Sequence, residues 1–512
     1  MYTRHFDLRY PWLTLSLVVI LALTAVGCGQ ASGTMAEKAP EASLQLDSSL
    51  LGMQTIAAGL DVPWEICWGP DDRIWFTEQN GSISRLDPTT GEKKLLLRIP
   101  EVWRHRSAGL LGMAVGKLID NQVYVFVDFT HRHDSVITSR LVRYRLDGDT
   151  LVEARLLLEI PGNTGHNGSR VVLSPGGLLY WATGDAANLA NAQNRASLNG
   201  KILRLHTDGS IPADNPDPQS PVWAMGFRNM QGLTFSATGR LYASEHGDAT
   251  DDEINLLLPA GNYGWPLVEG FTHTDKEKQV QPAGSMPPLK AWTPTIAPAG
   301  MEYYGSDLIP EWTNSLLLGT LKDQSLRVLQ LDARGEQIST EQVFLEKALG
   351  RIRDICVSPQ GEVFLATSNR DWNPAPGFPK PQDDRIIRLA PDQRRAATVY
   401  SATAPGDPTT AQATTAQANP NPETIYNQYC ASCHKPDGRG LPGSFPALKA
   451  SPLVNGDPQA LIHLLLKGKK QMPAFEFLSN QELSAIGSFI RSSWGNNQTA
   501  ITEPTIQLSR NK

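Results

Sequence analysis

The chain has 512 residues, and its 46 Lys and Arg oppose 52 Asp and Glu, which leaves a formal net charge of -6. At ~150 residues per domain, this length excludes a single small domain. The near balance of charge gives no basic excess, so no nucleic-acid partner is expected. The 43 Gly and 37 Pro predict a body rich in turns and strands, and the five Cys are too few for a disulfide scaffold.

The N-terminus has the pattern of an export signal. Basic residues precede an apolar run over residues 12–26, which is too short to cross a bilayer comfortably. The run ends at Ala25-Val26-Gly27-Cys28, which resembles a bacterial lipobox. The alternative is an ordinary signal peptide with an incidental cysteine. We therefore expect a signal peptide over residues 1–28, a periplasmic protein anchored to the membrane by a lipid on Cys28, and a tether over residues 29–51.

A strand-turn-strand pattern recurs in the next part of the chain. In each copy an apolar strand is followed by a turn with Pro or Gly and then by a second apolar strand, which is typical of a hairpin. Self-similar units of this kind indicate a β-propeller, and residues 52–395 are long enough for six blades of ~40–50 residues. A pair of β-sandwiches would lack the recurring pattern. The four copies lie at residues 64–77, 171–182, 233–244 and 355–366.

The composition changes after the predicted propeller. Residues 396–422 contain much Ala, Thr, Gln, Asn and Pro, and we expect them to form a linker. Apolar residues then repeat at helical spacing, for example at Leu483, Ile486 and Ile490. We therefore predict a small all-α domain over residues 423–495 and a polar tail over residues 496–512.

The predicted helical domain opens with a haem-attachment motif. Cys430-Ala431-Ser432-Cys433-His434 is C-x-x-C-H, in which Cys430 and Cys433 form thioethers to the haem vinyl groups and His434 becomes the proximal iron ligand. A zinc site would need a second pair of ligands, and the only other His in this domain is His463. A thioredoxin-type redox motif is not expected, because the βαβ pattern that accompanies such a motif is missing around these cysteines. Export also agrees with haem c, which is attached outside the cytoplasm.

Met472 is the expected sixth ligand of the haem iron. It is the only Met after Met301, and it lies where class I cytochromes c carry their methionine ligand. Met and His ligation raises the reduction potential and suits an electron carrier. His463 is the alternative ligand, although it also fits a solvent-facing helix position. The segment from residue 423 to 495 resembles a class I cytochrome c over nearly its whole length.

Cys67 and Cys356 occupy equivalent positions in the first and last copies of the repeated pattern. The first and last blades of a propeller are neighbours when the ring closes. A disulfide between these two cysteines is therefore one possibility in an oxidising compartment, and two buried thiols are the other. The sequence leaves this choice open.

A series of motifs runs in order through the propeller region. They are Gly200-Lys201-Ile202-Leu203-Arg204, Gly226-Phe227-Arg228-Asn229-Met230-Gln231-Gly232-Leu233, Ser244-Glu245-His246-Gly247, Asp252-Glu253-Ile254-Asn255 and Gly261-Asn262-Tyr263-Gly264-Trp265-Pro266. With these motifs, the chain between Pro63 and Arg388 resembles the soluble quinoprotein glucose dehydrogenase and aldose sugar dehydrogenase family. That resemblance implies a six-bladed propeller, the cofactor pyrroloquinoline quinone (PQQ), calcium, and oxidation of the C1 hydroxyl of aldoses to lactones.

The resemblance assigns a set of residues to PQQ. The cofactor is a tricarboxylate with an electrophilic quinone, so its pocket needs fixed cations. Arg351 and Arg353 alternate on a predicted strand and so share one face. By resemblance they bind the cofactor carboxylates, and Arg228 holds the charge that develops at the quinone. The other cofactor-binding residues that the resemblance implies are Lys322, Asn229, Gln231 and Thr295.

His166 matches the family's catalytic base, and near neutral pH an imidazole can accept the anomeric hydroxyl proton while hydride leaves C1. The resemblance also implies calcium in two places. The carbonyl groups of Gly247 and Asp248 match the ligands of an ion that touches the cofactor. Glu253 and the carbonyl of Tyr263 match a structural ion, and oxygen ligands of this kind suit calcium.

Three residues depart from the family pattern. Ser107 stands where the family often has a Gln that touches the cofactor, Gly165 stands where the glucose enzyme has an Asp beside the base, and Asp248 replaces a usual Pro. The first change weakens a cofactor contact, and the second removes a carboxylate that orients the base. Together they favour the broader aldose branch over the glucose-specific one, and a sorbosone-type aldehyde remains within the same chemistry.

The sequence thus predicts a periplasmic quinoprotein dehydrogenase that oxidises an aldose or a related aldehyde and passes electrons to its own haem c, and from there to an acceptor of the respiratory chain. The alternative is a non-catalytic propeller that binds a glycan or a protein partner and carries an electron-transfer cytochrome. The sugar, the anomer, the terminal acceptor and the oligomeric state are left open.

Overall fold

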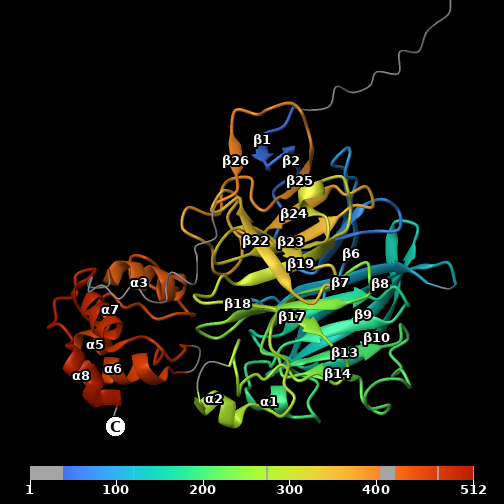
Figure 1. The fold of residues 1–512 in the computed structure, drawn as a ribbon. Helices are drawn as coiled ribbons and strands as arrows, with labels where there is room; N and C mark the ends of the chain where they lie inside the picture. The colour runs from blue at the N-terminus through green and yellow to red at the C-terminus, as the bar shows by residue number, and fades with distance from the viewer. Residues whose placement is uncertain (1–38, 119, 273–274, 404–420, 470–471, 511–512) are drawn as a thin grey trace, which may run out of the picture. The chain divides into compact units, whose positions relative to one another are not determined.

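Six β-sheets follow one another along the chain and surround a common axis (Figure 1). The first strand of each sheet contacts the first strands of the two neighbouring sheets, and these contacts close into a ring. The predicted six-bladed β-propeller is confirmed. The inner strands of the ring are β3 (Pro63–Trp68), β7 (Leu110–Lys117), β11 (Gly168–Leu173), β15 (Met230–Phe235), β19 (Pro298–Tyr304) and β23 (Ile352–Val357).

Each inner strand pairs with an antiparallel second strand, which in turn pairs with a third and then a fourth. The second strands are β4 (Ile74–Glu78), β8 (Val123–His133), β12 (Leu179–Thr183), β16 (Leu241–Glu245), β20 (Ser315–Thr320) and β24 (Val363–Thr367). The third strands are β5 (Ser82–Leu86), β9 (Val136–Asp147), β13 (Lys201–Leu205), β17 (Asp252–Leu257), β21 (Leu326–Leu331) and β25 (Ile386–Pro391). The fourth strands of the first five sheets are β6 (Lys93–Arg98), β10 (Thr150–Pro161), β14 (Val222–Met225), β18 (Lys290–Trp292) and β22 (Ile338–Phe344).

The last sheet is closed by strands from the N-terminal part of the chain. Its order is β23-β24-β25-β2-β1-β26, in which β2 is Leu50–Ala57, β1 is Ala42–Gln45 and β26 is Val399–Ser401. The sheet therefore reaches into the expected tether and, through β26, into the expected linker. The boundary of the expected tether is corrected because Leu44 and Leu51 within it are completely buried against the last blade. The expected linker begins with three residues, Val399–Ser401, that pair with β1.

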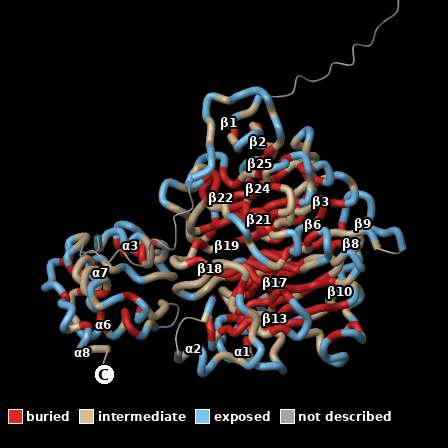
Figure 2. Tube along the Cα trace, in the orientation of Figure 1, coloured by how far each residue is buried: buried red, intermediate tan, exposed pale blue. Residues whose placement is uncertain are grey.

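The repeated sequence pattern coincides with four of the six inner hairpins. In the first, Cys67 lies opposite Trp75 across β3 and β4, and in the last Cys356 lies opposite Phe364 across β23 and β24. Buried positions follow the strands of every blade (Figure 2). The two hairpins that the pattern missed are β7–β8 and β19–β20. The second of these is joined by a long connection that contains a 3-10 helix, Pro310–Trp312, in place of a short turn.

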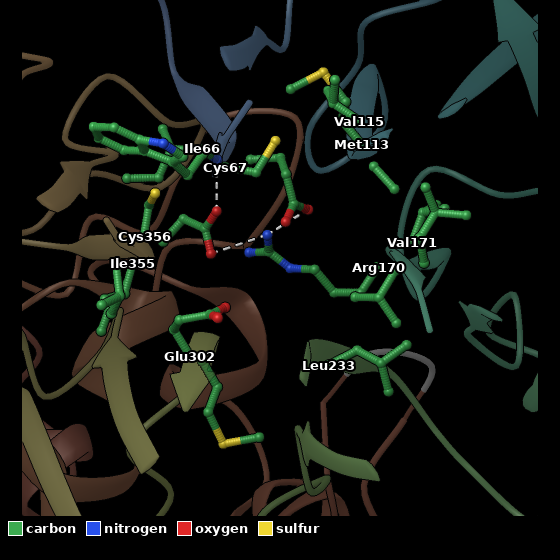
Figure 3. A pocket seen from close by; sticks show the side chains of 18 residues that line it. Ile66, Cys67, Met113, Val115, Arg170, Val171, Leu233, Glu302, Ile355 and Cys356 are labelled. Carbon is green, nitrogen blue, oxygen red and sulfur yellow. Dashed lines mark hydrogen bonds and ion pairs between the residues drawn. The ribbon is translucent and has the colours of Figure 1, made fainter. Parts of the chain in front are cut away.

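An internal cavity of about 240 Å³ lies along the propeller axis and is lined by residues of all six inner strands (Figure 3). At its centre Nη1 of Arg170 forms ion pairs with the carboxylates of Glu65 at 2.5 Å and Asp354 at 3.0 Å. The Nε atom of Arg170 also donates to the carbonyl of Gln231 at 2.5 Å. Arg170 therefore ties together inner strands of four different blades. Glu302 faces the same cavity.

Cys67 and Cys356 are free thiols. Cys356 is buried in a cluster with Ile66 of the first blade, whereas Cys67 packs against a cluster that includes Met113 of the second blade. At these equivalent positions, each cysteine side chain thus packs toward the next blade along the ring. For this reason the two thiols enter different cores and do not face each other, although their strands are neighbours.

Helices make up the C-terminal part of the chain, as expected for a small all-α domain. Their apolar faces meet in one core that includes Tyr426, Leu461 and Ile486. A capping box between Ser479 and Glu482 opens the longest helix. The helices are α3 (Pro422–Tyr429), α4 (Ala431–His434), α5 (Pro452–Asn455), α6 (Pro458–Lys467), α7 (Asn480–Ser492) and α8 (Glu503–Arg510). Two short helices, α1 (Ala190–Gln193) and α2 (Asp275–Val280), lie in propeller loops.

The expected polar tail is partly structured. Helix α8 lies within it, and its Ile506 is 1% exposed in the core of the helical domain. One buried apolar residue per turn is enough to hold a short polar helix on a core, which the overall polarity of the segment concealed. The polar tail over residues 496–512 is therefore corrected to a segment that ends in a packed helix.

The computed structural model describes residues 39–118, 120–272, 275–403, 421–469 and 472–510. Residues 40–512 form one compact unit. The predicted signal peptide, the lipobox with Cys28 and most of the predicted linker lie outside the described residues. In the described ranges, no helix is both long enough and apolar enough to span a membrane.

Candidate active site

The predicted site residues gather at one end of the propeller. His166, Asn229 and Arg351 come just before or at the start of inner strands, and Lys322 follows a second strand. Since the first and second strands of a blade are antiparallel, the start of one and the end of the other lie at the same end of the sheet. The fold therefore brings these residues together from four different blades.

His166 is paired with a carboxylate that the sequence analysis did not identify. Its Nδ1 lies 3.0 Å from Oδ1 of Asp185, which is completely buried, and 28% of the His166 side chain is exposed. Oδ2 of Asp185 accepts a hydrogen bond from Nε1 of Trp265 at 2.9 Å. Asp185 thus fixes the imidazole through Nδ1 and leaves Nε2 for a substrate. The orienting carboxylate that Gly165 was expected to remove is supplied here by Asp185.

The electrostatic surroundings of His166 favour its neutral form. Loss of hydration and the nearby Arg228 guanidinium lower the pKa of His166, while the hydrogen bond and the charge of Asp185 raise it, and the net change is downward. A neutral imidazole with a free Nε2 can accept a proton, which is what a general base requires. The pair His166 and Asp185 is therefore suited to remove a hydroxyl proton near neutral pH.

Arg351 and Arg353 converge as their alternation on the strand predicted. Both guanidinium groups pair with Oδ2 of Asp371, and the distance from Nη2 of Arg351 is 3.1 Å. Burial alone would raise the pKa of Asp371, but Arg353 and Arg351 hold it below its ordinary value. The Arg353 guanidinium also lies 4.0 Å from the ring centroid of Trp64, which holds it in place.

Asn229 and Gln231 connect the arginines to the base. Nε2 of Gln231 donates to Oδ1 of Asn229 at 3.2 Å, and Nη1 of Arg353 donates to Oε1 of Gln231 at 3.3 Å. Oδ1 of Asn229 also accepts from the backbone N–H of Gly168, two residues beyond His166. On the other side of the site, Nζ of Lys322 donates to Oγ1 of Thr295 at 2.7 Å. The structure thus places each predicted cofactor-binding residue of the propeller in this region.

Arg228 lies between the base and the outer edge of the site. Its Nη2 pairs with Oδ1 of Asp248 at 2.7 Å, and its guanidinium lies 5.4 Å from the ring centroid of Trp265. The positive charge of Arg228 reaches a further histidine, since burial and Arg228 together lower the pKa of His246 to about 3. Arg228 therefore adds positive charge beside both histidines.

The donors of the site fit an anionic cofactor. The Nε atoms of Arg228 and Arg351 are buried and have no hydrogen-bond partner among the described residues. Such orphaned donors on a cation are costly unless a ligand accepts from them. Several fixed cations beside a proton acceptor are what a tricarboxylate quinone requires, so this set of side chains fits PQQ.

The expected calcium ligands do not converge in the same way. The two carboxylate oxygens of Glu253 accept hydrogen bonds from the N–H of Gly270 and from the amide of Asn255, and the side chain of Asp248 is paired with Arg228. Within the described ranges, no group of three or more His, Cys, Asp or Glu is arranged to hold an ion. One observation does fit a cation, because Oδ1 of Asn255 is buried beside Glu253 without a partner. The positions of the Gly247 and Tyr263 backbone carbonyls neither support nor contradict a calcium site.

The haem motif lies where the first two helices of the C-terminal domain meet. Nδ1 of His434 is 2.9 Å from the carbonyl of Pro446, which fixes the ring and leaves Nε2 available for iron. Cys430 is buried and Cys433 is partly exposed. Met472 packs against the core of this domain, whereas His463 is exposed on α6. These positions favour Met472 over His463 as the sixth ligand.

Two of the departures from the family pattern lie beside each other near the base. Oγ of Ser107 donates to the carbonyl of Thr164 at 3.2 Å, and a Cβ atom built on Gly165 would lie 3.5 Å from that Oγ atom. Apart from the chain neighbours of Gly165, Ser107 Oγ is the only atom within 4 Å of that Cβ atom among the described residues, so there is space beside Gly165, the residue that directly precedes His166.

Comparisons with known proteins agree with this geometry. Residues 60–373 match the family model described as Glucose / Sorbosone dehydrogenase, and residues 417–490 match the model described as Cytochrome C oxidase, cbb3-type, subunit III. The chain is 28% identical to quinoprotein glucose dehydrogenase B of Acinetobacter calcoaceticus, over 62% of this chain and 86% of that protein. It is also 28% identical to the aldose sugar dehydrogenase YliI of Escherichia coli K12, over 62% of this chain and 90% of that protein.

A solved structure extends the likeness to three dimensions. The PQQ-bound aldose sugar dehydrogenase of Streptomyces coelicolor shares 32% sequence identity with the chain and superposes with a TM-score of 0.59. The superposition covers 69% of this chain and all of that one. The part of the chain that it leaves uncovered is large enough to include the cytochrome c domain.

Proposed function

Because the chain belongs to the glucose/sorbosone dehydrogenase family and carries a C-terminal cytochrome c domain, we propose that it oxidises the C1 hydroxyl of aldoses, or a related aldehyde, with PQQ and passes the electrons to its own haem c. The observation that carries this proposal is the pairing of His166 with Asp185 beside the cluster of Arg228, Arg351 and Arg353. A proton acceptor and a set of anion-binding cations at one end of a propeller are the two parts that this reaction needs.

Each residue of the site has a separate role in the proposed reaction. Nε2 of His166 accepts the hydroxyl proton of the sugar, and Asp185 stabilises the imidazolium that forms. Bound PQQ would supply a quinone that accepts the hydride from C1. Arg351, Arg353 and Lys322 would hold its carboxylates, and Arg228 would stabilise the negative charge that develops at the quinone. The sugar loses one proton and one hydride, which converts the hemiacetal to a lactone.

The space beside Gly165 bears on the substrate. Ser107 and Gly165 leave room next to His166 where larger side chains would restrict a sugar. We therefore propose a substrate class of several aldoses in place of glucose alone. Calcium at Glu253 and at the carbonyl groups of Gly247 and Asp248 also belongs to this proposal, supported by the unpartnered Oδ1 of Asn255.

The cellular location is proposed from the N-terminal sequence. Basic residues, a short apolar run and Cys28 support export to the periplasm and a lipid anchor there. The C-x-x-C-H motif supports the same location, since haem c is attached outside the cytoplasm. A respiratory-chain acceptor would take the electrons from the haem.

The test adds PQQ and calcium to the purified haem-loaded protein, then a panel of aldoses and aldehydes, and follows the haem absorption spectrum. We expect an aldose to reduce the haem only when PQQ is present. His166→Ala is expected to slow this reduction ~10²-fold or more, because it removes the general base. His463→Ala, an exposed histidine, is the matched control and should behave as the wild type.

Two results would contradict the proposal. The first is a haem that no sugar or aldehyde reduces in the presence of PQQ, and the second is a His166→Ala variant as fast as the wild type. An Arg351/Arg353 double substitution addresses the non-catalytic alternative. Tight PQQ binding that this double substitution abolishes supports the enzyme, whereas a wild-type protein with no PQQ affinity supports a binding propeller that only carries a cytochrome.

A further inference from the structure

An arginine of the propeller lies between two aromatic rings, one from each part of the chain. The Arg106 guanidinium is 5.2 Å from the ring centroid of Trp372 and 5.8 Å from that of Phe445. The two rings are themselves 5.4 Å apart at 41°. Nε of Arg106 also donates to Oγ of Ser444 at 3.1 Å. Trp372 belongs to the propeller and Phe445 to the haem domain, so their rings are in direct contact.

A polar contact lies beside the aromatic one. Nζ of Lys435 donates to Oδ1 of Asn373 and, at 3.4 Å, to the carbonyl of Pro374. Lys435 directly follows the proximal histidine, and Asn373 directly follows Trp372. The same short loop of the propeller therefore meets the haem-attachment segment through an aromatic ring and through a cation.

On the propeller side this loop is continuous with the cofactor pocket. Trp372 donates its backbone N–H to Oδ1 of Asp371 at 2.7 Å. The other oxygen of Asp371 accepts from both Arg351 and Arg353, the two residues assigned to the cofactor carboxylates. Only one peptide unit and one carboxylate therefore separate the Trp372 ring from the proposed cofactor ligands.

On the other side the contact is continuous with the haem ligand. Phe445 precedes Pro446, whose carbonyl lies 2.9 Å from Nδ1 of His434. The propeller loop that carries Trp372 and the segment that fixes the proximal histidine are therefore in direct contact.

We propose that the contact of Trp372 with Phe445, held by Arg106, is the route by which electrons leave the cofactor pocket for the haem. The inference rests on the proposed function, because it needs a reduced cofactor as the electron donor. Oxidation of one aldose yields two electrons and two protons. Bound haem c would accept these electrons singly, as Fe(III) to Fe(II), provided that a one-electron acceptor reoxidises it between the two transfers, and the two protons would pass to water.

The experiment compares two rates in the full-length holoprotein loaded with PQQ. The first is reduction of the haem after mixing with an aldose, followed by stopped-flow absorbance. The second is turnover with a small soluble dye that takes electrons from PQQ directly. We expect Trp372→Ala and Phe445→Ala each to slow haem reduction about tenfold or more and to change dye turnover less than about twofold.

Further variants separate electron transfer from structure. Trp372→Phe keeps an aromatic ring and should restore most of the haem-reduction rate. The haem-reduction rate of the double variant Trp372→Ala/Phe445→Ala should lie within about twofold of the rate of either single variant, because each single change already removes the same contact. Trp68→Ala is the matched control, since Trp68 is a half-buried tryptophan of the first blade that packs on Phe364 of the last blade. It should leave the ratio of the two rates unchanged.

The outcomes are distinguishable. If Trp372→Ala reduces its haem as fast as the wild type, the inference is wrong while the proposed function stands. If haem reduction and dye turnover fall by the same factor, Trp372 acts through Asp371 on the pocket and the electron route is overturned. If the wild type shows no dye turnover with any aldose, the proposed function itself fails and the inference falls with it.

Discussion

His166 shows how one side chain is tuned by opposed neighbours. Loss of hydration and Arg228 lower its pKa, and Asp185 acts in the opposite direction through a hydrogen bond and its charge. The result is a base that stays neutral somewhat below the ordinary range of histidine and has one nitrogen already committed. The lowest pH at which His166 can still act as a base therefore depends on Asp185 as well as on the imidazole itself.

Replacement of Asp185 tests this balance. Asp185→Asn removes the charge that raises the pKa of His166, so we expect the acid limb of the pH–rate profile for aldose oxidation to move to lower pH. The same change leaves the imidazole poorly oriented, and kcat should fall ~10²–10⁴-fold. Dye-linked turnover between pH 5 and 9 measures both effects. An acid limb that stays in place or moves upward would contradict this account, and the exposed Asp149→Asn serves as control.

The sixth haem ligand is a second question at this scale. Met472→Ala removes a thioether ligand that raises the reduction potential. We expect the potential to fall on the order of 0.1 V, a modest part of the ~0.8 V that axial ligands control. A spectroscopic redox titration of the holoprotein gives the value. His463→Ala should not change it, and the opposite pattern in the two variants would assign the ligand to His463.

Sequence reasoning identified the cations of the site but not their partners. Arg351 and Arg353 follow from alternation on a strand, which is local geometry. Asp185 and Asp371 were missed because each contacts its partner across a hairpin or a loop, so their roles depend on register. Asp185 could have been found, since it follows Thr183, which pairs with Gly168 at the start of the strand that His166 precedes.

At the scale of elements, the closing sheet also shows that contacts between distant parts of the sequence are not predicted by local patterns. The repeated pattern located four inner hairpins, because a Pro or Gly turn between apolar strands is a local signal. Strand β1 has only four residues within a polar stretch. It pairs with the adjacent β2 on one side, and on the other side with β26, which lies more than 300 positions away in the sequence. No local pattern reveals such a pairing. The expected tether therefore became part of the ring.

The closing strand should contribute strongly to stability. Leu51 in β2 is completely buried against the last blade. Leu51→Ala leaves a cavity there, and we expect the free energy of unfolding to fall by ~2–5 kcal/mol. Thr55→Ala in the same strand loses only a hydrogen bond to Glu41 at an exposed position and should cost less than ~1 kcal/mol. Urea unfolding followed by tryptophan fluorescence gives both values, and equal losses would show that β2 does not close the ring.

At the scale of the whole molecule, the axis is where the six blades depend on one another. Arg170 is the cation that three carboxylates face, those of Glu65, Asp354 and Glu302 (Figure 3). Two of them are paired with it directly. Glu302 is the third, and loss of hydration and the charge of Asp354 raise its pKa to about 8. Three ionised carboxylates would carry more negative charge than one guanidinium balances, so the folded protein favours the protonated form of Glu302.

This preference predicts a dependence of stability on pH. A carboxyl group whose folded pKa is about 8 and whose ordinary pKa is 4.5 stabilises the fold fully below pH 4.5, and the contribution is lost as the pH rises to about 8. Glu302→Gln keeps the shape and cannot ionise. Between these two pH values, we therefore expect the free energy of unfolding of the variant to rise relative to that of the wild type by up to ~1.4 kcal/mol per pH unit. Above pH 8 the difference between the two proteins should stay constant. Urea unfolding at pH 5, 7 and 9 measures the difference. A difference that stays constant across these three pH values would show that Glu302 is already ionised in the folded protein at pH 5 and that Arg170 balances all three carboxylates.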